Sequence, residues 1–142
     1  MPEDFRFNHR IKVRFRDIDM MGHVNNSVYL TYLEEARRHY FLNALKALPS
    51  MDSSFIVAGI TINYRSPAHL GEELEVRLGV RELRTSSFVF EFRIVEPSSE
   101  RIVSDGRVVQ VTYDYGSGTK TEIPETYRKA FCEFEGIEEC VP

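Results

Sequence analysis

One segment of helical periodicity followed by four segments of strand periodicity most constrains what this chain can fold into. Residues 27–45 place their apolar side chains on one stripe of a helix, and that stripe comprises Tyr29, Leu33, Ala36 and Tyr40, with Tyr32 at its margin. The chain after Pro49 instead alternates apolar with polar residues, which is typical of half-buried strands. The connections between these strands are short, and short connections favour antiparallel neighbours.

Five segments carry the strand pattern, and turn-forming residues separate them. The expected strands are residues 11–15, 56–64, 74–80, 88–95 and 102–115. A short C-terminal helix is expected to open at Ile123-Pro124-Glu125, since proline is favoured in the first helical turn. A long helix with one apolar face needs a sheet to cover it, so we predict a single α+β domain over residues 1–142, in which one helix lies across five antiparallel strands.

Several of these strands are apolar on both faces, which predicts association between copies of the chain. Val89 and Val95 lie opposite the row of phenylalanines, and Val103 and Val109 lie opposite Ile102 and Val108. One helix cannot cover both faces of such a sheet. We therefore expect a homodimer or homotetramer.

Composition excludes several classes of protein. The formal charge of −4 over 142 residues argues against a general nucleic-acid binder. The apolar runs are too short to span a membrane, and the N-terminus lacks the apolar core of a secretory signal, so we expect a cytoplasmic protein with no membrane contact. Cys132 and Cys140 have no neighbouring histidines, so we expect free thiols, and we predict neither a metal nor a cofactor.

Residues 17–26 concentrate chemically active side chains between the first strand and the long helix. They include two carboxylates, one imidazole, two amides and a glycine, at Asp17, Asp19, Gly22, His23, Asn25 and Asn26. A carboxylate at a helix N-terminus meets the positive end of the helix dipole and unpaired backbone N–H groups. This arrangement suits hydrolytic chemistry, but the same residues also serve as turn-formers and helix caps, with Asn25 or Asn26 as the expected N-cap.

Three segments resemble the hotdog-fold acyl-CoA thioesterases, in the 4-hydroxybenzoyl-CoA thioesterase branch. The first is residues 13–26, whose Asp-x-Asp-x-x-Gly-His-Val-Asn-Asn string continues to Tyr29-Leu30 and residues 34–37. The second is residues 62–74, and the third is residues 111–124, which end in Ile123-Pro124. The resemblance implies a hotdog fold, in which a five-stranded antiparallel sheet wraps around one long helix. It also implies an enzyme that hydrolyses an acyl- or aroyl-CoA thioester to the free acid and CoA.

The resemblance makes Asp19 the catalytic carboxylate, because it is the second Asp of the pair and Gly22 follows in register. Asp19 would act as general base or as nucleophile, while Asp17 would brace the turn. Backbone N–H groups of residues 25–27 would polarise the thioester carbonyl. His23 would orient Asp19 or the attacking water, although a hydrogen-bonded loop histidine is an equal interpretation.

The other site predictions concern substrate contacts, assigned to Gly22, Asn25, Asn26, Tyr29 and Arg65. Tyr29 is also a candidate for the core, and Arg65 is one candidate for the CoA phosphates together with His69, Arg81 and Arg84. Glu34 is an alternative catalytic carboxylate, because other hotdog branches place their acid on the helix, but it also fits a solvated pair with Arg38. The substrate is an acyl-CoA, with the acyl group left open.

Other functions fit the same fold. A hotdog hydratase or dehydratase would leave the thioester bond intact, a non-catalytic module would bind acyl-CoA without turnover, and a structural oligomer would bind no CoA ester. Plant-type acyl-carrier-protein thioesterases share the His-Val-Asn-Asn string but carry a catalytic Asn where this chain has Met21. The Asp-x-Asp-x-x-Gly register favours hydrolysis.

Overall fold

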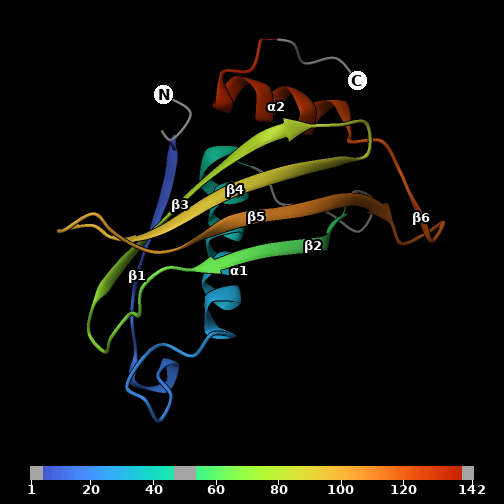
Figure 1. Ribbon diagram of the computed structural model, residues 1–142. Helices are drawn as coiled ribbons and strands as arrows, with labels where there is room; N and C mark the ends of the chain where they lie inside the picture. The colour runs from blue at the N-terminus through green and yellow to red at the C-terminus, as the bar shows by residue number, and fades with distance from the viewer. Residues whose placement is uncertain (1–4, 47–53, 139–142) are drawn as a thin grey trace.

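The long helix lies across one face of a curled antiparallel sheet in the computed structural model, which describes residues 5–46 and 54–138 (Figure 1). Helix α1 (Val28–His39) continues directly into a π-helical turn, η2 (Tyr40–Ala44). The predicted apolar stripe is confirmed, because its members are at most 3% exposed: Tyr29, Tyr32, Leu33, Ala36 and Tyr40. This helix therefore forms because its buried face recurs at helical spacing.

The sheet contains the five predicted strands and one short addition. In spatial order these are β1 (Phe7–Lys12), β3 (Glu73–Leu83), β4 (Ser87–Glu96), β5 (Arg101–Asp114) and β2 (Ser54–Tyr64), and every pairing is antiparallel. The addition is β6 (Thr119–Lys120), two residues that pair with the end of β5. The hotdog architecture predicted from the sequence is confirmed.

The first strand begins and ends earlier than predicted. Residues 11–15 were expected to form it, but β1 ends at Lys12 and residues Phe15–Asp17 form a 3-10 turn, η1, that leaves Phe15 77% exposed. The chain turns here because Val13 exchanges backbone hydrogen bonds with the loop before β3. The carboxylate of Asp17 then accepts the Arg14 N–H at 3.0 Å, which stabilises the turn. Apolar alternation alone does not reveal this interruption.

Aromatic side chains fill the space between the sheet and α1. Phe88, Phe90 and Phe92 point to the helix from β4 and are at most 2% exposed. Tyr40 meets Phe90 edge to face with ring centroids 5.1 Å apart. Each such ring removes a large apolar area from water, which stabilises the fold by roughly 2–3 kcal/mol per side chain.

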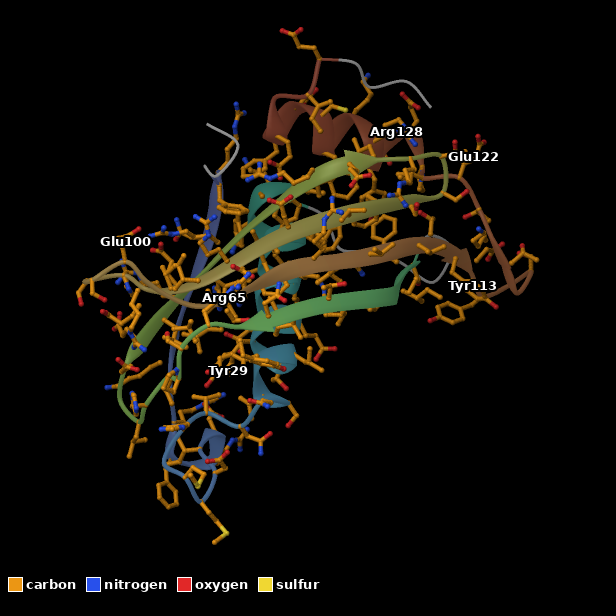
Figure 2. The ribbon with its side chains drawn as sticks, viewed as in Figure 1. Tyr29, Arg65, Glu100, Tyr113, Glu122 and Arg128 are labelled. Carbon is orange, nitrogen blue, oxygen red and sulfur yellow. The ribbon has the colours of Figure 1, made fainter. Side chains whose placement is uncertain are left out.

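Helix α2 (Glu125–Glu135) packs against one end of the sheet, as the sequence predicted from Pro124. Arg128 is 2% exposed and points from α2 to the β3–β4 connection, where it donates to the carbonyl oxygen of Arg84 (Figure 2). Glu135 accepts hydrogen bonds from the Tyr40 hydroxyl at 2.6 Å and from the Val80 N–H at 3.0 Å. These contacts tie α2 to both layers.

Two further expectations change with the structure in hand. Cys132 is disulfide-bonded, so the expectation of a free thiol was wrong there, while Cys140 lies outside the described residues. Val89 and Val95 are 1% exposed within the single chain, so this part of the sheet needs no partner to cover it.

Within residues 5–46 and 54–138, no helix has the length and apolar character to cross a membrane.

Candidate active site

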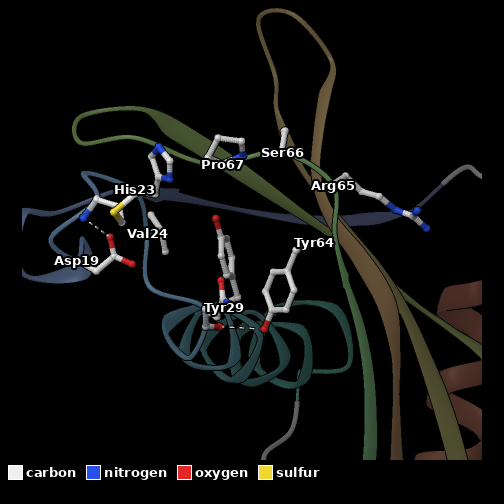
Figure 3. Close-up of a pocket in the computed structure, with 10 residues that line it drawn as sticks. Asp19, His23, Val24, Tyr29, Tyr64, Arg65, Ser66 and Pro67 are labelled. Atoms are coloured by element: carbon white, nitrogen blue, oxygen red, sulfur yellow. Dashed lines mark hydrogen bonds between the residues drawn. The ribbon is translucent and has the colours of Figure 1, made fainter.

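Three segments that are far apart in the sequence enclose a cavity of about 310 Å³ beside the start of α1 (Figure 3). They are the turn after η1, the first turn of α1, and the end of β2 with the loop that follows it. The lining residues are Asp19, Met21, His23, Val24, Asn26, Tyr29, Tyr64, Arg65, Ser66 and Pro67. Most of the predicted site residues therefore meet at one place.

A tight turn presents Asp19 to this cavity. The N–H of Asp19 donates to the carbonyl of His23 at 2.9 Å, and the N–H of Gly22 donates back to the carbonyl of Asp19 at 3.0 Å. Gly22 has φ +81°, a conformation that glycine adopts without a steric penalty. The Asp19 Oδ1 accepts the Met21 N–H at 2.9 Å, which orients the carboxylate. Its Oδ2 has no hydrogen-bond donor among the described residues.

Asp17 occupies a different environment, two residues earlier. Its side chain is buried, and Oδ2 accepts the Tyr32 hydroxyl at 2.7 Å as well as the Arg14 N–H. Burial and then this hydrogen bond raise the pKa of Tyr32 far above its usual range, so the hydroxyl stays a donor. The Asp17 carbonyl also accepts the Asn25 N–H at 2.9 Å. Asp17 thus joins η1, the turn and α1, as its predicted bracing role requires.

The start of α1 differs in detail from the prediction. Ser27 is the N-cap residue, not Asn25 or Asn26, but Asn25 Oδ1 accepts the Ser27 N–H at 2.9 Å and so stabilises the helix start from two residues away. The N–H groups of Asn25 and Ser27 are therefore both occupied. Asn26 lines the cavity, and its N–H has no acceptor within residues 5–46 and 54–138.

A loop between β2 and β3 forms the opposite wall, and Arg101 holds it in place. Arg101 donates to the carbonyl of Pro67, to Ser66 Oγ and to Glu72 Oε2, the last at 2.7 Å. Burial by itself raises the pKa of Glu72, but hydrogen bonds from the His69 N–H and from Arg101 bring that pKa below its usual value. Sequence reasoning missed Arg101, since nothing distinguishes it from other arginines on strands.

Two histidines join the turn to this loop. His23 pairs with His69 through an isolated antiparallel bridge, and their rings meet edge to face with centroids 5.1 Å apart. The neighbouring Val24 N–H donates to the Ala68 carbonyl at 2.9 Å. His23 is half-buried on the cavity wall, whereas His69 does not line the cavity.

Two tyrosines form the aromatic side of the cavity. Tyr29 is 3% exposed, and its ring centroid lies 5.6 Å from that of Tyr64, so it belongs both to the core and to the cavity wall. Burial raises the pKa of the Tyr29 hydroxyl. Tyr64, which sequence reasoning did not select, donates from its hydroxyl to the Asn26 carbonyl at 3.1 Å (Figure 3).

The predicted cationic residues lie at the edge of the cavity or away from it. The Arg65 guanidinium points away from the cavity and pairs with Asp105, with Nη2 and Oδ1 3.1 Å apart (Figure 3). Arg81 and Arg84 pair with Glu91 and Glu82 and do not line this cavity.

Glu34 also lies elsewhere. It borders a separate hollow with Leu30, Arg37 and Ile60, and no ion pair with Arg38 forms among the described residues.

Comparison with known proteins now places the chain in a family. Residues 13–131, most of its length, match the Thioesterase-like superfamily. The chain belongs to this superfamily. The match includes the turn, α1, the strands from β2 to β5 and the loop that walls the cavity, and it leaves out β1.

Two relatives that are similar over most of this chain are named as thioester hydrolases. The chain is 33% identical over 107 residues to the long-chain acyl-CoA thioesterase FadM of Escherichia coli (strain K12), covering 74% of this chain and 81% of FadM. It is 30% identical over 112 residues to the acyl-CoA thioester hydrolase YbgC of Escherichia coli O6:H1, covering 76% and 82%. Both of these relatives are named as enzymes that hydrolyse acyl-CoA thioesters.

Solved structures show the same fold. A thioesterase from Thermus thermophilus, described as complexed with coenzyme A and Zn, is 32% identical and superposes with a TM-score of 0.83 over 96% of this chain and 99% of that one. A Synechocystis 1,4-dihydroxy-2-naphthoyl-CoA thioesterase reaches a TM-score of 0.82 at 20% identity, over 89% and 96%, which bears on the fold alone.

Proposed function

We propose that this chain hydrolyses acyl-CoA thioesters to the free acid and CoA, with the reaction centred on Asp19. One observation carries the proposal: the Asp19 carboxylate borders the same cavity as Asn26, whose N–H is unpaired among the described residues. The first group supplies a base or nucleophile, and the second supplies a donor for the carbonyl oxygen. The relatives described as acyl-CoA thioesterases support the choice of substrate class.

In the proposed complex, the thioester carbonyl oxygen accepts the Asn26 N–H. This donor lies at the N-terminal end of α1, where the helix dipole also favours negative charge. The oxygen gains charge as the tetrahedral intermediate forms, so the donor stabilises the transition state more than the substrate. A donor of this kind typically lowers the barrier by about 3–4 kcal/mol.

Asp19 then activates the attack on the carbonyl carbon. Because the Met21 N–H orients Oδ1, Oδ2 is left to take a proton from water as the water oxygen adds to carbon. The C–S bond breaks, and the CoA thiolate leaves and takes up a proton. Alternatively, Oδ2 attacks carbon directly, CoA leaves, and water hydrolyses the resulting anhydride. His23, on the same wall, orients the carboxylate or the water.

The remaining substrate contacts follow from the cavity walls. Gly22 shapes the turn that presents Asp19, while Tyr29 and Tyr64 offer aromatic surface to the acyl group. Asn25 acts indirectly, because its Oδ1 accepts the Ser27 N–H at the start of the helix. The Arg65 guanidinium points away from the cavity and is partly balanced by Asp105, so in this proposal it meets the CoA phosphates outside the cavity, where the nucleotide emerges.

The proposed enzyme is a cytoplasmic homodimer or homotetramer. The apolar residues Leu30, Val57 and Ile60 are 36–41% exposed and border one hollow on α1 and the edge strand β2. Arg37 borders the same hollow, and its buried Nη1 has no hydrogen-bond partner among the described residues. Exposed apolar side chains around an unsatisfied buried donor indicate a surface that a second copy covers.

A thiol-release assay tests the activity. The purified protein is incubated with short-chain, long-chain and aromatic acyl-CoAs and with one acyl-carrier-protein ester, and free thiol is measured. We expect thiol release from at least one CoA ester. Tight binding without thiol release indicates an acyl-CoA-binding module. Conversion of the ester to a hydrated or dehydrated ester, with no thiol released, indicates a hydratase or dehydratase. No binding indicates a structural role.

A further inference from the structure

We propose that His9, Glu35 and His39 form a binding site for a divalent transition metal ion of the zinc class. His9 comes from the edge strand β1, while Glu35 and His39 lie one turn apart on α1 and share a helix face. Their ligand atoms all lie within 4.8 Å of one another. The three residues belong to neither the cavity of Asp19 nor the proposed reaction.

The geometry is close to that of a bound ion. His9 Nε2 and Glu35 Oε2 are 2.7 Å apart, and the rings of His9 and His39 are stacked with centroids 4.1 Å apart. Ligands at about 2.1 Å in a tetrahedral zinc site lie roughly 3.4 Å from one another. Side-chain rotations that move these ligand atoms by about 1 Å therefore suffice to bring them to the separations found around a zinc ion. The side chain of Glu35 is 44% exposed, which leaves room for this movement.

The hydrogen bond between His9 and Glu35 does not account for the position of the third residue of the cluster, His39. His9 and Glu35 satisfy each other, but within the described residues the polar contact of His39 is a long one, 3.4 Å from Nδ1 to the Asn43 amide. With that amide turned over, Asn43 Oδ1 accepts the Nδ1–H, and Nε2 keeps its lone pair for a metal. Metal-bound histidines commonly hold the second ring nitrogen in such a hydrogen bond.

The donor set selects the class of metal. Two imidazole nitrogens and one carboxylate oxygen suit zinc, nickel or copper, whereas magnesium and calcium prefer oxygen alone. Arg10, Lys12 and Arg14 share a hollow with Glu35, so nearby positive charge weakens the binding of a dication. Glu35 is nine residues from Asn26, about 14 Å along the helix, so the ion would clamp β1 to α1 and not touch the thioester.

Zinc titration of the untagged, chelator-treated chain tests the site. We expect calorimetry to show one ion per chain, the imidazole nitrogen resonances of His9 and His39 to shift, and the melting temperature to rise with zinc concentration. Absence of saturable binding overturns the proposal. Shifts confined to His23 and His69, the other pair of neighbouring histidines, also overturn it.

Matched variants locate the ligands. His39→Gln should weaken zinc binding by at least about tenfold, because one of three protein ligands is lost. Glu35→Gln should act similarly while keeping a hydrogen bond to His9, so it tests the site in a chain whose fold is preserved. His69→Gln, the control, should bind zinc as the wild type does. Equal affinity in all four proteins contradicts the assignment.

Discussion

Asp17 and Asp19 are two residues apart, yet their carboxylates meet opposite environments. Asp17 is buried and bound by the Tyr32 hydroxyl and the Arg14 N–H. Asp19 lies on the cavity wall, with one oxygen bound by a backbone N–H and the other unpartnered among the described residues. A bound carboxylate stabilises the fold, whereas an accessible one can take part in chemistry.

Asp19→Asn should lower turnover by about 100- to 10,000-fold, because the amide is neither a base nor a nucleophile. The shape of the side chain is kept, so acyl-CoA affinity should stay within a few-fold of wild type. Steady-state kinetics and equilibrium binding measure the two effects separately. Glu34→Gln is the matched control and should leave turnover unchanged; the reverse result assigns the chemistry to the helix.

Asp17→Asn should lower the free energy of unfolding by on the order of 1 kcal/mol, because two charge-assisted hydrogen bonds become neutral ones. The asparagine oxygen can still accept from Tyr32, so the fold should persist. Chemical denaturation measures the change. A variant as stable as wild type but without turnover would falsify the bracing role.

Gly106→Ala should destabilise the protein by about 1–3 kcal/mol or more, since a methyl group there overpacks two strands. Gly106 has φ +157°, and a Cβ at this position would lie 1.9 Å from the carbonyl oxygen of Thr61 on β2. Gly59→Ala on β2 is the control, because nothing lies within 4 Å of its Cβ position. Thermal melting of both variants should separate them clearly, and equal melting temperatures would rule out the close approach.

At the scale of elements, the loop between β2 and β3 forms one wall of the cavity, and an ion pair between Arg101 and Glu72 holds this loop in place. Arg101 on β5 holds the loop through Glu72, a residue of the loop itself, and the turn that carries Asp19 contacts the loop through His23 and Val24. Strand β5, which carries Arg101, therefore positions a wall of the candidate active site although no residue of β5 lines the cavity.

This arrangement predicts a dependence of stability on pH. The pKa of Glu72 is lower in the folded protein than in the unfolded chain, so its contribution is complete above the unfolded value of 4.5 and is lost as the pH falls through the folded value. Urea denaturation of wild type and Glu72→Gln from pH 7 to pH 3 should show a wild-type advantage that disappears at the acid end. An advantage that persists at pH 3 contradicts this account.

At the scale of the whole molecule, α1 covers one face of the sheet, and the edge strand β2 is partly uncovered. Exposed apolar residues of β2 and α1 gather around Arg37, while Val89 and Val95 on β4 are already buried. The surface expected to pair with a second copy is thus narrower than the sequence implied, and it lies at the β2 edge.

Ile60→Glu should convert the proposed oligomer to a monomer, because a charge would be buried in the contact. Light scattering at micromolar concentration measures the mass, and the melting curve shows whether the fold is retained. Tyr115→Glu, at an apolar residue that is 52% exposed elsewhere, should leave the mass unchanged. A wild-type chain that is already monomeric excludes the proposed assembly.

The sequence by itself determined the long helix, the five main strands and their antiparallel connections. It could do so because periodicity is a local property: each residue of a helix or strand takes its place from neighbours three, four or two positions away. Three segments of the sequence together indicated the family, and within the first of them the Asp-x-Asp-x-x-Gly string made Asp19, not Asp17, the predicted catalytic carboxylate, which stays a prediction.

Only the tertiary structure decided which distant residues meet. Tyr64 and Pro67 complete the cavity although they lie about 40 residues beyond the turn, and Arg101 on β5 holds their loop. His9 on β1 lies beside Glu35 and His39 on α1. The early end of β1 could not be predicted from the sequence for the same reason, because the chain after β1 is fixed by backbone hydrogen bonds to the loop before β3. Such contacts depend on how the elements pack, and a linear pattern of polar and apolar residues does not encode them.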